Sequence, residues 1–177
     1  MKNIKIWIGL SYLIILSVFL YFLFSKFSIQ EITSYDFIRS NSEYLVNFRE
    51  SNLILVSIIF IAIGVLWISV LFGFGSPLAL VSGFLFGVYF GTIIVAITLS
   101  LGATLAYIFA NFFFKNLIEE KFANRFEFLE KKIQANEFIA ILIYRFIGGI
   151  PFQIANLLPI LFKIKLKNYF FGTFLGI

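Results

Sequence analysis

Long stretches without a charged side chain alternate with short charged ones along the chain. An α-helix rises about 1.5 Å per residue, so about 20 apolar residues cross the ~30 Å hydrocarbon core of a bilayer. Four stretches approach or exceed that length: 6–24, 53–72, 78–114 and, apart from one arginine, 138–162. The pattern predicts an all-α integral membrane protein, a multi-pass helical bundle rather than a soluble domain.

The amino-terminal part of the chain predicts one membrane span and a surface segment. Lys2 and Lys5 precede an apolar run that is longer than the core of a signal peptide and lacks a small-residue cleavage site. We therefore expect a retained transmembrane helix over 1–24. Residues 25–51 are polar and carry apolar side chains at helical spacing. They predict an amphipathic segment at the membrane surface, with a solvated loop as the alternative.

Beyond a second span predicted over 53–72, the chain must fold back. The glycines around Pro77 and the proline itself break the helix, because proline lacks a backbone donor. One straight helix over the next apolar stretch would be far longer than a bilayer requires, so 73–114 contains a reversal. Either two short spans join through 87–91, or a re-entrant hairpin of two half-helices precedes one complete span from about Thr92.

Three glycines punctuate this stretch at intervals of four residues. On one continuous helix, Gly83, Gly87 and Gly91 would share a face and let a neighbouring helix approach closely. We interpret them as hairpin or helix-break positions, with ordinary tight packing as the alternative.

The remaining polar and apolar segments alternate in the same way. The interval 115–137 predicts a polar surface helix, supported by pairs such as Glu127 with Lys131 at i,i+4. The apolar stretch 138–162 predicts a second re-entrant hairpin. Residues 168–177 read as the opening of another helix, and we expect a truncation at the carboxyl terminus.

Two short segments are similar to one another. The sequences 89–92 and 170–173 both end in Phe-Gly-Thr, and each follows an apolar stretch interrupted by a proline, Pro77 in one case and Pro151 in the other. A pair of broken apolar segments in corresponding halves is typical of an inverted repeat with a binding site between the halves.

Composition then excludes several classes of function. The chain is 61% apolar and 13% charged, against roughly 45–50% and 25% in soluble domains. It contains no histidine and no cysteine, which excludes protease triads with those residues, zinc, haem and iron–sulfur ligand sets, and disulfides. We expect no enzymatic activity, no cofactor, no metal and no nucleic-acid partner.

One cation lies inside an apolar segment. Arg145 follows the start of its segment by about 10 Å of helix, where insertion of an arginine costs ~2.5–3.5 kcal/mol. The other apolar segments contain no acidic residue, so an ion pair would need an interfacial glutamate such as Glu50 or Glu137. A lipid phosphate would also fit, because a guanidinium donates two parallel hydrogen bonds to its oxygens. Snorkelling of the arginine to water is the open alternative.

The residues after Arg145 break the helix and add amides. Gly148, Gly149 and Pro151 free backbone groups, which a membrane tolerates only where protein or a water-filled cavity covers them. Gln153 and Asn156 supply donors and acceptors three residues apart. We predict that both amides join Arg145 in a substrate-binding cluster, with interhelical hydrogen bonding as the alternative.

Two stretches resemble the signatures of the DedA / SNARE-associated Golgi protein family, whose common unit is the VTT domain. The first signature corresponds to the glycine-punctuated sequence from Pro77 to Tyr107, and the second to the sequence from Tyr144 to Gly176. The resemblance covers about Ser51 to Ile177. It implies two re-entrant helical hairpins that enter from opposite faces in an inverted repeat, in proteins described as moving or scrambling lipids.

Two departures from the family pattern narrow the resemblance. The usual Arg-x-x-Pro is Arg145-x-x-Gly148 here, which leaves the kink to Pro151. The acidic residues that the DedA branch carries around its first re-entrant segment, where they are associated with proton coupling, are absent from 74–90. The match is therefore to the branch related to the Golgi proteins, and it argues against proton-driven transport.

Together these observations predict a protein of the plasma (inner) membrane that aids the transbilayer movement of phospholipids or polyprenyl phosphates. Membrane lipids are the expected partners, with an anionic headgroup near Arg145, and a homo-oligomer is compatible. A small-solute or ion transporter and a structural, partner-binding membrane protein are the alternatives. The topology stays open. Basic residues at 2–5 and in 115–137 both indicate the cytoplasmic side, which favours two full spans in 78–114, whereas the family resemblance favours a hairpin and one span there.

Overall fold

The computed structural model describes residues 46–70, 74–122 and 127–177, together with six isolated helical positions between 11 and 25. Side chains of 114–127 are outside this set. The chain divides into two compact units, 1–57 and 58–177, and the site lies in the second. In the described residues all regular structure is helical: α4 (Leu53–Val70), α5 (Gly75–Phe86), α6 (Val88–Phe122), α7 (Glu127–Ala135), α8 (Glu137–Ile147), α9 (Phe152–Leu157), the 3-10 helix η1 (Leu158–Phe162) and α10 (Leu166–Gly176).

Two of these helices are long and apolar enough to cross a membrane: Leu53–Val70, which is α4, and Val88–Phe113, the larger part of α6. The transmembrane helix expected over 1–24 and most of the surface segment expected over 25–51 lie outside the described residues. Positions 46–51 of that segment are helical.

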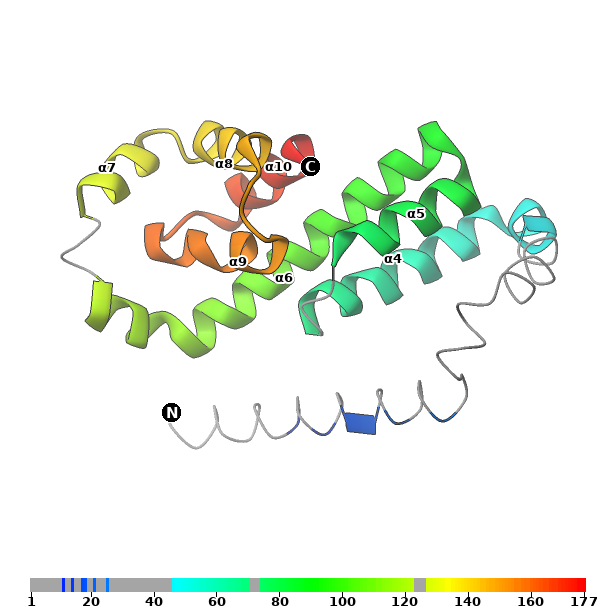
Figure 1. Ribbon diagram of the computed structural model, residues 1–177, viewed down its shortest axis with the longest axis horizontal. Coiled ribbons are helices and arrows are strands. Elements are labelled where there is room, and N and C mark those ends of the chain that lie inside the picture. Colours follow the sequence, from blue (N-terminus) through cyan, green and yellow to red (C-terminus); the bar gives the residue numbers. More distant parts are fainter. Residues whose placement is uncertain are drawn as a thin grey trace. The chain divides into compact units, whose positions relative to one another are not determined.

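The helices α4 and α6 run in the same direction, and α5 runs in the opposite direction (Figure 1). Their register follows from two close approaches. A Cβ on Gly64 would meet the side chain of Thr98, and a Cβ on Gly102 would lie 2.6 Å from Cβ of Ile68. Gly64 thus faces Thr98 and Ile68, one turn later, faces Gly102, as expected for two helices packed in parallel. With 12 residues, α5 is about 18 Å long and falls short of a bilayer's hydrocarbon core.

The reversal between α5 and α6 is made by Gly87 alone. Its φ of 76° lies in the left-handed region that favours glycine, and α6 resumes at Val88. The sequence alone predicts either two short spans joined by a turn over 87–91 or a re-entrant hairpin of two half-helices before a span from about Thr92. The structure instead has one short helix followed directly by the long one.

The three spaced glycines do not share one helical face, which corrects that expectation. Gly83 lies in α5, Gly87 ends it and Gly91 lies in α6. A Cβ on Gly91 would be 2.6 Å from the carbonyl oxygen of Ser82, whereas a Cβ on Gly83 would meet nothing within 4 Å. The hydroxyl of Ser82 donates to the Gly91 carbonyl at 2.8 Å. Gly91 is thus the position where α6 approaches the backbone of α5.

The polar surface helix expected over 115–137 is not one element. Residues 115–122 are the end of α6, because neither glycine nor proline separates them from the apolar part. A separate helix, α7, covers Glu127–Ala135. The predicted pair of Glu127 with Lys131 lies outside the described side chains, which exclude Glu127.

The last three helices follow the same path as the first three. The helices α8 and α10 run in one direction, and α9 with η1 runs in the opposite direction and packs against α6 (Figure 1). A Cβ on Gly172 would lie 2.9 Å from Cβ of Ile141, and a Cβ on Gly176 would lie 2.6 Å from Cβ of Arg145. These glycines, one turn apart, let α10 pack directly against α8.

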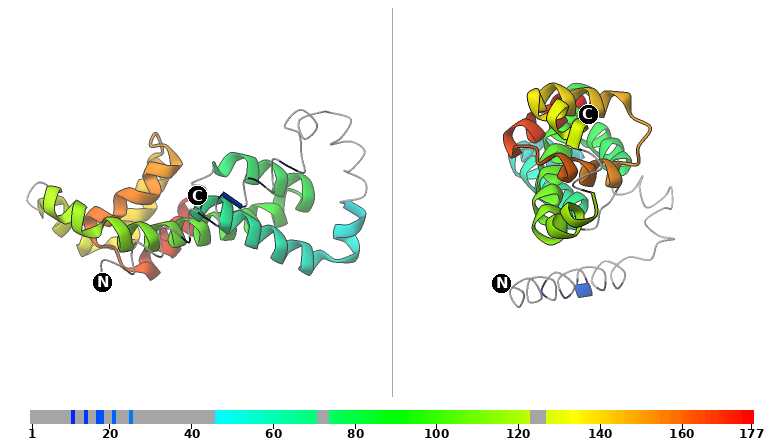
Figure 2. Two further views of the ribbon diagram at one scale, coloured as in Figure 1. Left: turned by 90° about the horizontal axis from the view of Figure 1, so that it is seen from below. Right: turned by 90° about the vertical axis from the view of Figure 1, so that its left-hand side faces the viewer.

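The two groups of helices meet along α6. The Tyr107 ring stacks on the Tyr169 ring with centroids 4.8 Å apart, and the Tyr107 hydroxyl donates to the Ile164 carbonyl at 2.9 Å. In the views of Figures 1 and 2, α10 runs opposite to α6. The buried apolar cluster at this junction consists of Ala103, Tyr107, Ala110, Ile141, Ile160, Ile164 and Tyr169.

The two Phe-Gly-Thr segments are not equivalent in this arrangement. Gly91 contacts the middle helix of its group, α5, whereas Gly172 contacts the first helix of its group, α8. The two halves are therefore similar in the directions of their helices, whereas the two Phe-Gly-Thr sequences do not occupy equivalent positions.

Candidate functional site

Arg145 lies in the last turn of α8, at the point where the helix ends. Gly148 and Gly149 follow with φ of 63° and 75°, a conformation that L side chains rarely adopt. Pro151 then precedes α9. The helix break predicted from these residues is present, and it brings α9 back beneath the arginine.

Three neutral oxygens from two other segments hold the guanidinium. Nη2 donates to Oδ1 of Asn156 at 2.9 Å and to the hydroxyl of Tyr169 at 2.8 Å. Nε lies 3.4 Å from Oγ1 of Thr173, at the long end of the range for a hydrogen bond. Asn156, Tyr169 and Thr173 are each 0–1% exposed, so the arginine is held by a rigid, buried set of partners.

Aromatic rings surround the same cation. The guanidinium carbon lies 5.9 Å, 5.7 Å and 5.6 Å from the ring centroids of Tyr144, Phe152 and Tyr169. Such distances allow attraction between the cation and the negative ring faces. The Tyr144 hydroxyl also donates to the Ala155 carbonyl at 3.3 Å, which fastens α8 to α9.

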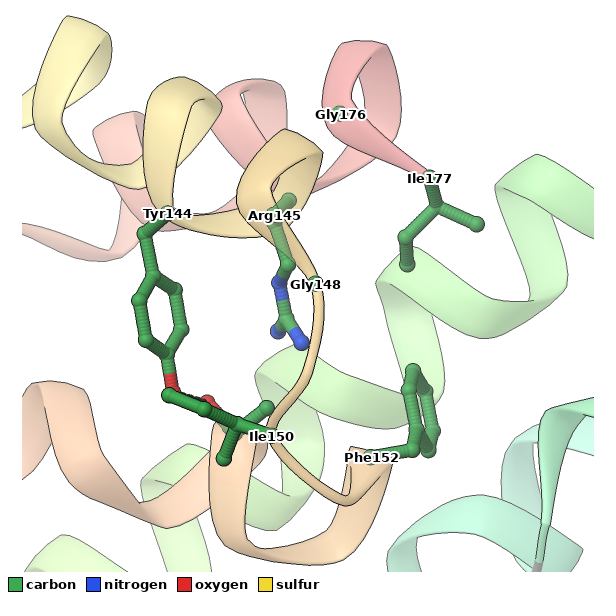
Figure 3. A pocket seen from close by; sticks show the side chains of 8 residues that line it. Tyr144, Arg145, Gly148, Ile150, Phe152, Gly176 and Ile177 are labelled. Carbon is green, nitrogen blue, oxygen red and sulfur yellow. Dashed lines mark hydrogen bonds between the residues drawn. The ribbon is translucent and has the colours of Figure 1, made fainter.

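A pocket of about 230 Å³ opens beside the arginine (Figure 3). Its volume is below the ~300–1,000 Å³ of drug-sized ligand sites, so it suits a small group such as a headgroup. Figure 3 shows the Arg145 side chain extending from α8 between Tyr144 and Phe152. The lining residues are Tyr144, Arg145, Gly148, Ile150, Phe152, Ala155, Gly176 and Ile177.

Arg145 makes no ion pair with any residue that the structure describes. Its second terminal nitrogen, Nη1, donates to no group in the same part of the chain and is not a buried, unsatisfied atom. Two N–H donors of a half-buried cation therefore stay available at the pocket.

Glu137, one of the carboxylates considered as a partner for Arg145, serves another purpose. Its Oε2 accepts from the backbone N–H of Lys165 at 3.1 Å and from Nδ2 of Asn168 at 2.7 Å. It is 7% exposed and fastens the start of α8 to the start of α10.

The two predicted amides behave differently. Asn156 joins Arg145, but Gln153 is half-buried on α9, does not line the pocket and makes no hydrogen bond to Arg145. The prediction that both amides belong to the cluster is therefore wrong for Gln153. Among the helix-break residues, Gly148 lines this pocket, whereas Pro77, Gly83, Gly87 and Gly91 belong to the α5–α6 region.

Sequence reasoning missed Tyr169 and Thr173 as partners of Arg145. They are four residues apart on α10, on one helical face, and 24 and 28 residues from the arginine. Thr173 belongs to the Phe-Gly-Thr repeat and to the second family signature, but neither feature indicated contact with the arginine. No group of three or more histidine, cysteine or acidic side chains that could hold a metal occurs within the described residues.

Comparison with known proteins adds one finding. The family described as the VTT domain matches residues 72–177, more than half of the chain and all of the segment from α5 to α10. No solved structure matches the chain.

Proposed function

Because this chain belongs to the VTT-domain family of integral membrane proteins, the DedA / SNARE-associated Golgi family, we propose that it aids the movement of phospholipids or polyprenyl phosphates across the bilayer. In this proposal the pocket beside Arg145 receives the phosphate of the headgroup. The chain is a multi-pass protein of the plasma membrane, with α4 and α6 as complete spans.

One observation carries the proposal. Arg145 is a half-buried cation whose partners in the described residues are all neutral. A charge in an apolar environment is stable only when a counter-charge and hydrogen bonds compensate for lost hydration. A phosphate supplies both, because its oxygens accept parallel hydrogen bonds from a guanidinium.

The three hydrogen-bond partners of Arg145 are uncharged, which allows the arginine to bind an anion and to release it. A carboxylate at the same position would hold the guanidinium permanently and neutralise it. Asn156, Tyr169 and Thr173 fix its orientation and leave its charge unbalanced. The ordered but uncompensated cation is suited to transient binding of an anionic group.

The short helices support a path through the membrane. We infer that α5 and the α9–η1 segment are half-helices of two re-entrant hairpins, since each is too short to cross ~30 Å of hydrocarbon. The group α8–α10 runs opposite to the group α4–α6, as in an inverted repeat. Broken helices at membrane depth are tolerated where they line a cavity, and the Arg145 pocket adjoins such a break.

A reconstitution experiment tests this function. The full chain is inserted into liposomes that contain a trace of phospholipid with a fluorescent headgroup, and a membrane-impermeant reductant bleaches the outer leaflet. We expect bleaching to continue beyond the outer-leaflet fraction only when the protein is present. A reporter glycolipid without phosphate should move much more slowly. Phospholipid movement equal to that in protein-free vesicles would refute the proposal.

A further inference from the structure

A second cleft, of about 490 Å³, lies where α6 meets the turn between η1 and α10. It shares no lining residue with the Arg145 pocket. The stacked rings of Tyr107 and Tyr169 stand between the two, since Tyr107 lines this cleft and Tyr169 binds Arg145. The cleft is therefore a separate feature of the molecule.

Two lysines line the cleft at the turn. Lys163 adopts the left-handed conformation, with φ of 49°, and its Nζ lies 3.1 Å from a carboxylate oxygen of Glu130. Lys165 is exposed and makes no ion pair within the described residues. Glu130 pairs with Lys163, and the buried carboxylate of Glu137 accepts from the backbone N–H of Lys165. The exposed ammonium of Lys165 is thus the cation of this cleft that favours an anionic ligand.

Apolar side chains line the same cleft on both helices. Ile108 and Phe112 of α6 are 41% and 40% exposed, and Leu166 of α10 is 46% exposed. Asn111 lies among them, half-buried, with no hydrogen bond from its amide in the described part of the chain. Cations beside exposed apolar side chains match a molecule with an anionic head and a hydrocarbon tail. A free phosphate ion would leave the apolar side chains uncovered.

We propose that this cleft binds one anionic phospholipid, whose headgroup lies at Lys163, Lys165 and Asn111 and whose acyl chain lies along Ile108, Phe112 and Leu166. The volume falls within the ~300–1,000 Å³ typical of ligand sites. The binding is an equilibrium property and requires no movement of lipid across the bilayer. It stands apart from the function proposed for Arg145.

Photolabelling in nanodiscs tests this site. The full chain is placed in phosphatidylcholine discs with a small fraction of phosphatidylglycerol that carries a photoreactive group near the headgroup, and labelled peptides are identified by mass spectrometry. We expect labels on peptides containing 108–112 and 163–166, and several-fold less labelling with an equivalent phosphatidylcholine probe. Raising the salt concentration should weaken the labelling, because exposed charges are screened.

Variants at neighbouring lysines provide the matched comparison. Lys165→Gln should lower the labelling about fivefold, which corresponds to ~1 kcal/mol for one basic side chain at an anionic surface. Lys165→Arg should retain it. Lys167→Gln removes the same charge from an exposed lysine that does not line the cleft, and it should leave the labelling unchanged. Melting temperatures of all three variants establish that each is folded.

Several results would overturn the proposal. Equal losses in Lys165→Gln and Lys167→Gln would show a general surface charge effect, and equal labelling by the two lipids would show no preference for anions. Complete competition by millimolar inorganic phosphate would identify a phosphate-ion site instead of a lipid site. Because the readout is binding, each of these results is independent of whether the protein moves lipids.

Discussion

Arg145 donates a hydrogen bond to the hydroxyl of Tyr169 across 2.8 Å, joining the last turn of α8 to the first turn of α10. The same hydroxyl lies 3.4 Å from the carbonyl oxygen of Asn156, and the Tyr169 ring stacks on Tyr107 of α6. A single fully buried tyrosine thus positions the arginine against three separate segments.

Replacing that tyrosine should weaken both stability and lipid movement. Tyr169→Phe keeps the ring stack but removes an acceptor from a cation, for which we expect a loss of ~1.5–3 kcal/mol. Tyr144→Phe is the matched control, because its hydroxyl bonds only a neutral carbonyl at 3.3 Å and should cost ~0.5–1.5 kcal/mol. Thermal melting in detergent measures the difference. Equal melting temperatures for the two variants would contradict the assigned role of Tyr169.

The close approach of α5 and α6 should make one glycine of the spaced set intolerant of a side chain. Gly91→Ala would place Cβ 2.6 Å from the Ser82 carbonyl oxygen, and we expect a destabilisation of ~1–3 kcal/mol. Gly83→Ala meets open space within a helix and should be neutral or stabilising by up to ~1 kcal/mol. Melting temperatures that fall equally for both would show that the turn at Gly87 is misplaced.

At the helix break after α8, a side chain on Gly148 should be unfavourable because of the backbone conformation and not because of a steric clash. A Cβ on Gly148 would meet nothing within 4 Å, yet φ of 63° with ψ of −152° strains any L residue. Gly148→Ala should therefore cost ~1–3 kcal/mol. The neighbouring Ile147→Ala, at a side chain that is 77% exposed, should change the melting temperature little in detergent. The reverse order of the two effects would argue against the observed break.

The buried carboxylate of Glu137 should stabilise the start of α10. Glu137→Ala leaves the Lys165 N–H and the Asn168 amide without an acceptor, at ~1–3 kcal/mol for each group. Glu137→Gln retains one acceptor oxygen and should lose less. Glu50→Ala tests an exposed carboxylate 3.8 Å from Arg49 and should cost ~0–1 kcal/mol. Chemical unfolding curves for the three variants should rank in that order, with Glu137→Ala the least stable.

From the sequence we could predict the cation of the site and the helix break beside it, but only some of the side chains that contact the cation. Arg145, Pro151 and Asn156 were recognisable because a charge, a proline and an amide stand out in an apolar stretch. Tyr169 was not, because its place beside the arginine depends on how α10 packs on α8 through Gly172. Gln153 was assigned wrongly, since the hydrogen bond from α9 to Arg145 comes from Asn156 alone among the two amides and Gln153 does not line the pocket.

The boundaries of the long helices show a similar limit. The fold-back after Pro77 follows from the length of the apolar stretch, but its position at Gly87 required the backbone conformation. The end of α6 at Phe122 was also not predictable from polarity. A change from apolar to polar side chains alters what a helix faces but does not by itself end the helix, and α6 accordingly continues through the charged residues 115–122.

The most direct test of the central claim compares Arg145→Gln with Gln153→Ala in the liposome assay. Both variants change a polar side chain near Pro151, but only the first removes the cation at the pocket. The account predicts phospholipid movement close to the protein-free rate for Arg145→Gln and close to the unmodified rate for Gln153→Ala, with both variants folded. Unchanged movement in Arg145→Gln would contradict it.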